Sequence, residues 1–217
     1  MVQILILAGV AAFLFWRLSI VLGIRTGFEK TVDLKIEDKP KNEQVDIENI
    51  KSDSADDDIS DYVDLLSDSG QQLKKIKDKE NAFSVQNFVS GAKSAYEIIL
   101  MAFEKGDLNI LEEHLASDVY EDFKNVVIDR ANNGYTVDAN FAGLREIRIR
   151  NVVFDEESMN AEITVFFKCD LTSVVKDKNN EIIEGNSSKV KAHTDTWTFG
   201  RIIGVDDPSW KLIATGE

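Results

Sequence analysis

Residues 88–115 read FVSGAKSAYEIILMAFEKGDLNILEEHL, and this stretch decides the class of fold. Its apolar side chains recur every three or four residues, which is the period of a helix with one buried face. Ser84 can cap this helix at its N-terminus, and Gly106 can end it, because glycine readily adopts the left-handed conformation found after a helix. Asp107 and Ser117 are predicted caps of two further helices. The sequence therefore predicts three consecutive helices.

The hydrophobic period changes to two after residue 134, which indicates strands. Turn-forming residues such as Lys178, Asn179 and Asn180 separate the apolar runs. Helices followed by a run of strands predict an α+β domain in which N-terminal helices pack on an antiparallel sheet. The predicted strands cover residues 144–154, 161–175, 188–203 and 210–215.

An apolar segment lies at the start of the chain. Residues 4–24 contain one charged side chain and are long enough to cross the bilayer core of about 30 Å. No basic region precedes this segment and no small-x-small cleavage site follows it, which argues against a signal peptide. Arg25, Lys30 and Lys35 follow the segment, so the positive-inside rule predicts an external N-terminus and a cytoplasmic C-terminal domain. We expect a transmembrane anchor over residues 1–24.

The next segment, residues 25–83, is predicted to be an acidic flexible linker. Residues 31–80 carry 15 acidic and 8 basic side chains. The excess of acidic over basic residues in this segment accounts for half of the formal net charge of −14. Charged segments with few apolar residues cannot bury enough surface to fold alone. Within the linker, a short apolar cluster suggests a helix that folds on a partner's groove. Its members are Ile59, Tyr62, Val63, Leu65 and Leu66.

The composition argues against several classes of function. A net charge of −14 disfavours nucleic-acid binding, because phosphate recognition needs a basic face. Cys169 is the only cysteine, so a disulfide framework is excluded, and the histidines His114 and His193 show no zinc-type spacing. A glycine loop that would bind phosphate is missing. We expect no cofactor, no metal and no nucleic-acid partner.

Motifs in both the anchor and the domain resemble those of the Tim44-like family, which comprises the mitochondrial import-translocase adaptor and its bacterial relatives. Residues 88–115 resemble the Gly-Ala-Lys, Ala-Tyr, Ala-Phe and Gly-Asp helix pattern of the family. The ending TDTWTFGRIIGVDDPSWKLIAT at 194–215 resembles the family's Trp-Thr-Phe and Asp-Pro-x-Trp motifs. LGIRTGFE at 22–29 resembles the signature that follows the membrane span of bacterial members. The resemblance covers the anchor and residues 84–217.

The resemblance implies a cone-shaped fold similar to the nuclear-transport-factor-two superfamily, with helices and a curved sheet enclosing an apolar cavity. It also implies a single-pass inner-membrane adaptor whose cytoplasmic domain binds a protein partner, such as a translocase or chaperone component, or a lipid. The chain lacks the long helical chaperone-binding region of the mitochondrial protein. Residues 200–205 are also more apolar than the Arg-Asp-rich family version, which weakens a basic contact surface there.

Two groups of residues are candidates for contacts with such a partner. Arg145, Arg148 and Arg150 lie along a predicted strand, either as a solvated face or as a basic strip that meets anionic lipid or a protein. Aromatic side chains either fill the core or line a cavity that accepts a lipid tail or an apolar peptide. The candidate cavity residues are Tyr96, Phe103, Phe166, Phe167, Trp197, Phe199 and Trp210.

The alternative function is a cone-fold enzyme that uses His193 and Asp195 in the domain cavity. Strand alternation places both side chains on one face, and a carboxylate can raise the basicity of an imidazole. Residues i and i+2 of a strand lie side by side, however, and no third catalytic group is identifiable. We therefore expect no enzymatic activity and keep this pair as the alternative.

Overall fold

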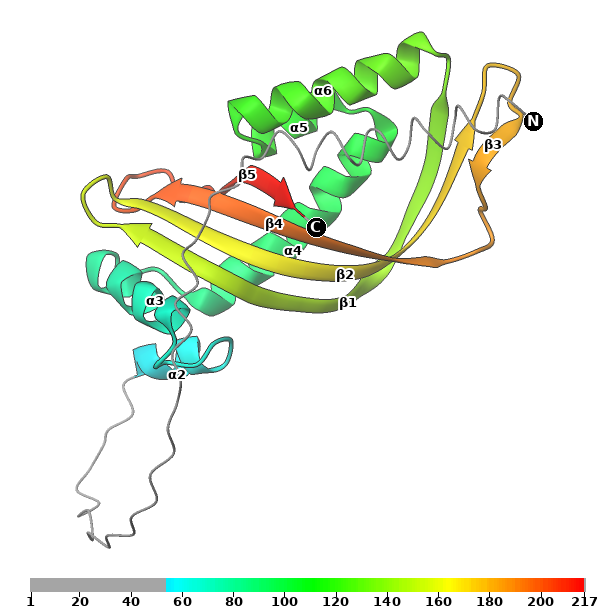
Figure 1. Ribbon diagram of the computed structural model, residues 1–217. Helices are drawn as coiled ribbons and strands as arrows, with labels where there is room; N and C mark the ends of the chain where they lie inside the picture. The colour runs from blue at the N-terminus through cyan, green and yellow to red at the C-terminus, as the bar shows by residue number, and fades with distance from the viewer. Residues whose placement is uncertain (1–53, 217) are drawn as a thin grey trace, which may run out of the picture. The chain divides into compact units, whose positions relative to one another are not determined.

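Five helices precede five strands in the computed structural model, which describes residues 54–216. This order, with the helices packed on a curved antiparallel sheet (Figure 1), confirms the predicted α+β class. The helices are α2 (Ser54–Ser60), α3 (Asp68–Lys79), α4 (Val85–Lys105), α5 (Leu108–His114) and α6 (Ser117–Asn132). The strands are β1 (Thr136–Asp155), β2 (Asn160–Lys176), β3 (Ile182–Gly185), β4 (Lys191–Ile202) and β5 (Lys211–Gly216).

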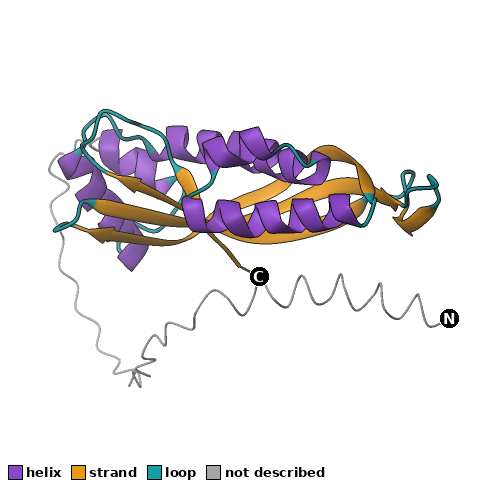
Figure 2. Cartoon of the chain, turned by 90° about the horizontal axis from the view of Figure 1, so that it is seen from above, coloured by secondary structure: helices purple, strands orange, loops and turns teal. Residues whose placement is uncertain are grey.

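The sheet has the strand order β1-β2-β4-β5, and β3 pairs with the far end of β2. The β1–β2 ladder contains three register shifts, which bend a sheet and increase its twist. As a result the sheet curves around α4, and α5 and α6 lie on the same concave side (Figure 1). The hairpin that contains β3 extends past the helices (Figure 2).

The ends of α4 follow the sequence signals. Ser84 is the N-cap, and its hydroxyl accepts a hydrogen bond from the amide of Asn87 at 3.2 Å. Gly106 ends the helix in the left-handed conformation with φ of 73°.

The prediction of Ser117 as the cap of the third helix is wrong. Ala116 is the N-cap of α6, and its amide donates to the carbonyl of Leu212 on β5 at 2.9 Å.

The main core lies between α4 and the concave face of the sheet. Alternate residues of β2 from Ala161 to Leu171 are buried, and the residues between them are half-buried. On α4 the buried positions recur at helical spacing, which gives the helix its inward face. These positions are Val85, Phe88, Ala92, Tyr96, Ile99 and Ala102.

The folded unit begins at Ser54, so the predicted linker over residues 25–83 is wrong for its last thirty residues. Ile59, Leu73, Ile76 and Phe83 are buried, although charged residues dominate the segment. The physical reason is that α3 is amphipathic: its few apolar side chains share one face and pack towards β1.

The apolar cluster predicted to bind a partner folds on its own chain instead. Ile59 is fully buried where α2 contacts α3 and α4, whereas Leu66 is 87% exposed. The rest of the predicted linker and the predicted anchor over residues 1–24 lie outside the described residues. Within residues 54–216 no helix is long and apolar enough to cross a membrane.

Candidate functional site

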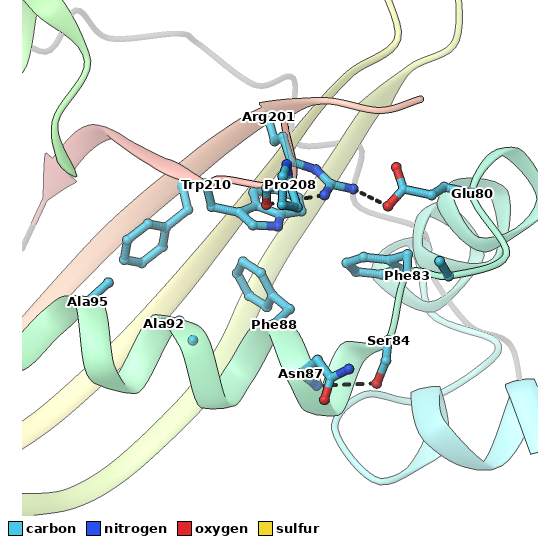
Figure 3. Close-up of a pocket in the computed structure, with 13 residues that line it drawn as sticks. Glu80, Phe83, Ser84, Asn87, Phe88, Ala92, Ala95, Arg201, Pro208 and Trp210 are labelled. Carbon is cyan, nitrogen blue, oxygen red and sulfur yellow. Dashed lines mark hydrogen bonds and ion pairs between the residues drawn. The ribbon is translucent and has the colours of Figure 1, made fainter. Parts of the chain in front are cut away.

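A cleft of about 440 Å³ lies between the first half of α4, strand β4 and the loop that leads from β4 to β5 (Figure 3). Its walls are aromatic, because Phe83, Phe88, Phe199 and Trp210 all line it. The rings hold one another in place: Phe88 and Trp210 meet edge to face with centroids 4.8 Å apart, and Phe83 lies 6.1 Å from Trp210. Three of the lining residues on α4 are small, namely Gly91, Ala92 and Ala95.

Arg201 is the one charged residue that is buried in the described part of the chain, and it lines the cleft. Its Nη2 atom donates to Oε1 of Glu80 at 2.6 Å, and its Nη1 atom donates to the carbonyl of Pro208 at 3.3 Å. The guanidinium carbon lies 5.1 Å from the centre of the Trp210 ring. The Nε atom is buried and has no hydrogen-bond acceptor among the described residues.

Glu80 fixes the position of Arg201 from the end of α3. Its Oε2 atom also accepts a hydrogen bond from the amide of Gly204 at 3.1 Å. Partial burial alone would raise the pKa of Glu80, but the hydrogen bonds from Arg201 and Gly204 outweigh burial and lower it below its ordinary value. Glu80 therefore stays ionised beside the buried guanidinium.

Sequence reasoning missed this ion pair. Glu80 lies 121 residues from Arg201 and falls in the segment predicted to be a flexible linker. One signal was available: Arg201 continues the inward alternation of His193, Asp195, Trp197 and Phe199 along β4. A charged residue at such a position needs a buried partner.

The predicted aromatic cavity does not form as one space. Tyr96, Phe167 and Trp197 are buried against one another, and the Tyr96 and Phe167 rings are stacked with centroids 4.3 Å apart. These three side chains fill the core, whereas Phe199 and Trp210 line the cleft.

The last two candidates for the cavity lie elsewhere. Phe103 packs against Phe123 with centroids 4.9 Å apart. Phe166 lies on the opposite face of the sheet from Phe167, because adjacent residues of a strand point to opposite faces. The expectation that Phe166 and Phe167 share a cavity is therefore wrong.

The three candidate arginines lie on β1, and two of them meet Phe166. The guanidinium groups of Arg148 and Arg150 lie 5.1 and 4.8 Å from the centre of its ring. Two of the three positive charges are compensated locally: Arg145 pairs with Asp170 at 2.7 Å, and Arg148 pairs with Glu146 at 2.6 Å. The basic strip is therefore weaker than the sequence suggests.

The candidate catalytic pair is not joined in the structure. Asp195 accepts a hydrogen bond from the hydroxyl of Tyr96 at 2.6 Å, and the same hydroxyl lies 3.2 Å from Sγ of Cys169. Burial, and then the charge of Asp195, raise the pKa of Tyr96 well above its ordinary value. Burial also raises the pKa of the Cys169 thiol. His193 pairs with Cys169 across the β2–β4 ladder, and no hydrogen bond between His193 and Asp195 is found in the described residues.

Metal binding has no evident location in residues 54–216, where no group of three His, Cys, Asp or Glu side chains is placed to hold an ion.

Comparison with known proteins gives a family and a likeness to solved structures. The family model described as the Tim44-like domain matches residues 69–217. Among solved structures, the crystal structure of the intermembrane space region of the chloroplast protein ARC6 is similar, with 14% sequence identity and a TM-score of 0.40. That match covers 59% of this chain and 94% of that chain. No curated protein matches the chain. The family match begins within α3, and thus includes most of a helix that the sequence placed in the linker.

Proposed function

Because the chain belongs to the Tim44-like family, we propose that it is a membrane-associated adaptor that binds a protein partner at a translocation or other membrane complex. In this proposal residues 4–24 cross the inner membrane once, with the N-terminus outside. The folded domain then works on the cytoplasmic side, which the positively charged residues after the apolar segment favour.

The observation that carries the proposal is the cleft between α4, β4 and the loop that leads from β4 to β5. It combines aromatic walls with a buried cation, and its lining residues Asn87 and Gly91 on α4 are exposed to solvent. Apolar grooves with a few fixed polar groups suit a peptide segment or a helix of another protein. The side chain of Asn87, which is exposed, borders the groove and offers an additional polar group at its rim.

A role without catalysis agrees with the surroundings of His193 and Asp195. The carboxylate of Asp195 is engaged by the Tyr96 hydroxyl, which favours a structural role in the core. A general base needs a free acceptor within reach of a substrate proton. The enzymatic alternative therefore has less support than the adaptor.

Lipid contact is the second candidate role, and Arg150 is the residue that favours it. Its side chain is exposed on β1, and its guanidinium lies over the Phe166 ring. An exposed cation attracts anionic lipid even when the whole domain is acidic.

The test of the adaptor role is cross-linking of the full-length chain in its native membrane. A photoreactive residue in place of Asn87, at the rim of the cleft, should give a reproducible protein adduct. The same residue in place of Lys178, which is exposed on the distal hairpin, is the control. Gly91→Trp should abolish the adduct, because the new side chain enters open space and fills the cleft. An adduct that persists in Gly91→Trp, or its absence from both positions, contradicts the proposal.

Lipid contact has a separate test. The binding of the folded domain, residues 54–217, to vesicles is measured with and without anionic lipid in the vesicles. Arg150→Ala should reduce binding to the anionic vesicles. Equal binding to both kinds of vesicle would exclude this role.

A further inference from the structure

The solvent-facing side of α4 carries a regular seam. Its residues are separated by four and three positions in alternation, which is the spacing that lets two helices pack along a common line. All of them are exposed except Met101, which is half-buried. The seam consists of Asn87, Gly91, Ser94, Ile98, Met101 and Lys105.

The seam changes from small to large along the helix. In the first half, a Cβ atom added at Gly91 would meet no atom within 4 Å, so open space lies beside the backbone. In the second half, Ile98 is an apolar side chain that remains 41% exposed. The first half of the seam therefore has small residues, Gly91 and Ser94. The second half has large apolar residues, Ile98 and Met101, which could fill the space beside small ones.

From this pattern we propose that α4 of a second copy of this chain packs antiparallel on α4. The inference rests on the proposed function of the cleft as a docking site, and names its partner. In the antiparallel register, Met101 of the second copy faces Gly91, and Ile98 of the second copy faces Ser94. A two-fold axis repeats both contacts, so the interface is closed and self-complementary. In a parallel pair of α4 helices, Ile98 and Met101 of the two copies would face each other, and a gap would remain between the two Gly91 residues.

Two hollows lie along the seam, one for each half. The aromatic cleft opens beside Gly91. The second hollow, of about 540 Å³, lies between α4 and α5 and is lined by Ile98, Met101 and Ile110. The antiparallel helix covers both hollows at once and removes the exposed part of Ile98 from water, which favours association.

The test is register-specific disulfide formation in full-length chains that carry two different tags and are produced together in membranes. One chain carries Ser94→Cys and the other Ile98→Cys, so that a disulfide joins the two tags. Cys169 is buried and remains unchanged. In the control pair, Gln86→Cys replaces Ile98→Cys, because position 86 is exposed on α4 but lies far from position 94 in this register.

The proposal expects a mixed-tag disulfide in the first pair and its loss in the control pair. Ile98→Asp should also abolish co-purification of the two tags without changing the thermal melting of the domain, since the side chain is exposed. Equal cross-linking in both pairs, or none in the first, overturns the proposal. A photo-adduct at Asn87 with a different protein overturns the second copy as occupant but keeps the adaptor role. The lack of any protein adduct contradicts both.

Discussion

Replacing Asp58 by alanine tests whether α2 belongs to the folded domain, because this side chain joins α2 to the first turn of α4. The carboxylate accepts hydrogen bonds from the amides of Val85 at 2.9 Å and Gln86 at 3.0 Å. It also accepts one from the hydroxyl of Ser84 at 3.3 Å and forms an ion pair with Lys77. Together with Ser84, which holds the next amide, Asp58 satisfies the free amides at the start of the helix.

The expected cost of Asp58→Ala follows from these contacts. Loss of a helix cap costs about 0.5–2 kcal/mol. The variant also leaves Lys77 without its partner, although only 14% of that side chain is exposed. A charged hydrogen bond contributes about 1.5–3 kcal/mol, and the two losses overlap, so we expect the free energy of unfolding to fall by about 2–3 kcal/mol. Asp58→Asn keeps an acceptor at the cap and should cost about 1 kcal/mol.

Urea unfolding of residues 54–217, followed by circular dichroism, measures this difference. Hydrogen exchange should also become faster at the amides of Val85 and Gln86. Asp61→Asn is the matched control, because this aspartate is exposed just after α2 and should change stability by less than about 0.5 kcal/mol. If Asp58→Ala is as stable as that control, the described docking of α2 is refuted.

The pH dependence of the same variant gives a second check. Burial would raise the pKa of Asp58, but the hydrogen bonds from Lys77, Gln86 and Val85 together lower it below the ordinary value of 3.8. A carboxyl whose pKa is lower in the folded state stabilises the fold above its unfolded pKa and loses this effect as pH falls through the folded pKa. The difference in stability between the wild type and Asp58→Ala should therefore stay constant above pH 3.8 and shrink only as the pH falls further, through the lowered pKa of the folded state.

Three further outcomes are expected. Glu80→Gln should lower the free energy of unfolding by about 2–3 kcal/mol in urea titrations, because it leaves Arg201 buried without a counter-charge. Glu156→Gln, the control at an exposed ion pair, should leave the free energy of unfolding unchanged. Equal effects of Glu80→Gln and Glu156→Gln would contradict the argument that burial of Arg201 makes its counter-charge necessary. Tyr96→Phe should cost about 1–3 kcal/mol, because the carboxylate on β4 loses its buried donor; an unchanged thermal melting temperature would contradict this. Residues 84–217 alone should fail to unfold cooperatively, because four buried side chains upstream, each worth about 1.5–3 kcal/mol, are missing; a sharp calorimetric transition would contradict this.

Local patterns in the sequence determined the helices and strands around the site. The three-and-four spacing over residues 88–103, the cap at Ser84 and the glycine at 106 placed α4 correctly, because helix formation depends on neighbouring residues and on one apolar face. The period of two likewise predicted a strand over residues 161–175, which matches β2, but it did not identify the buried face of that strand. The resemblance of residues 88–115 and 194–215 to the Tim44-like family was confirmed by the family match, which covers residues 69–217.

The contacts that build the cleft were decided by the tertiary structure. Arg201 and Glu80 are 121 residues apart, and Asp58 lies 27 residues before the amide of Val85 that it caps. The charged composition of residues 54–83 predicted a flexible linker, because composition does not show that the few apolar side chains share one face. Whether such a segment folds depends on the surface that the rest of the chain offers it, and here the sheet and the exposed start of α4 provide that surface.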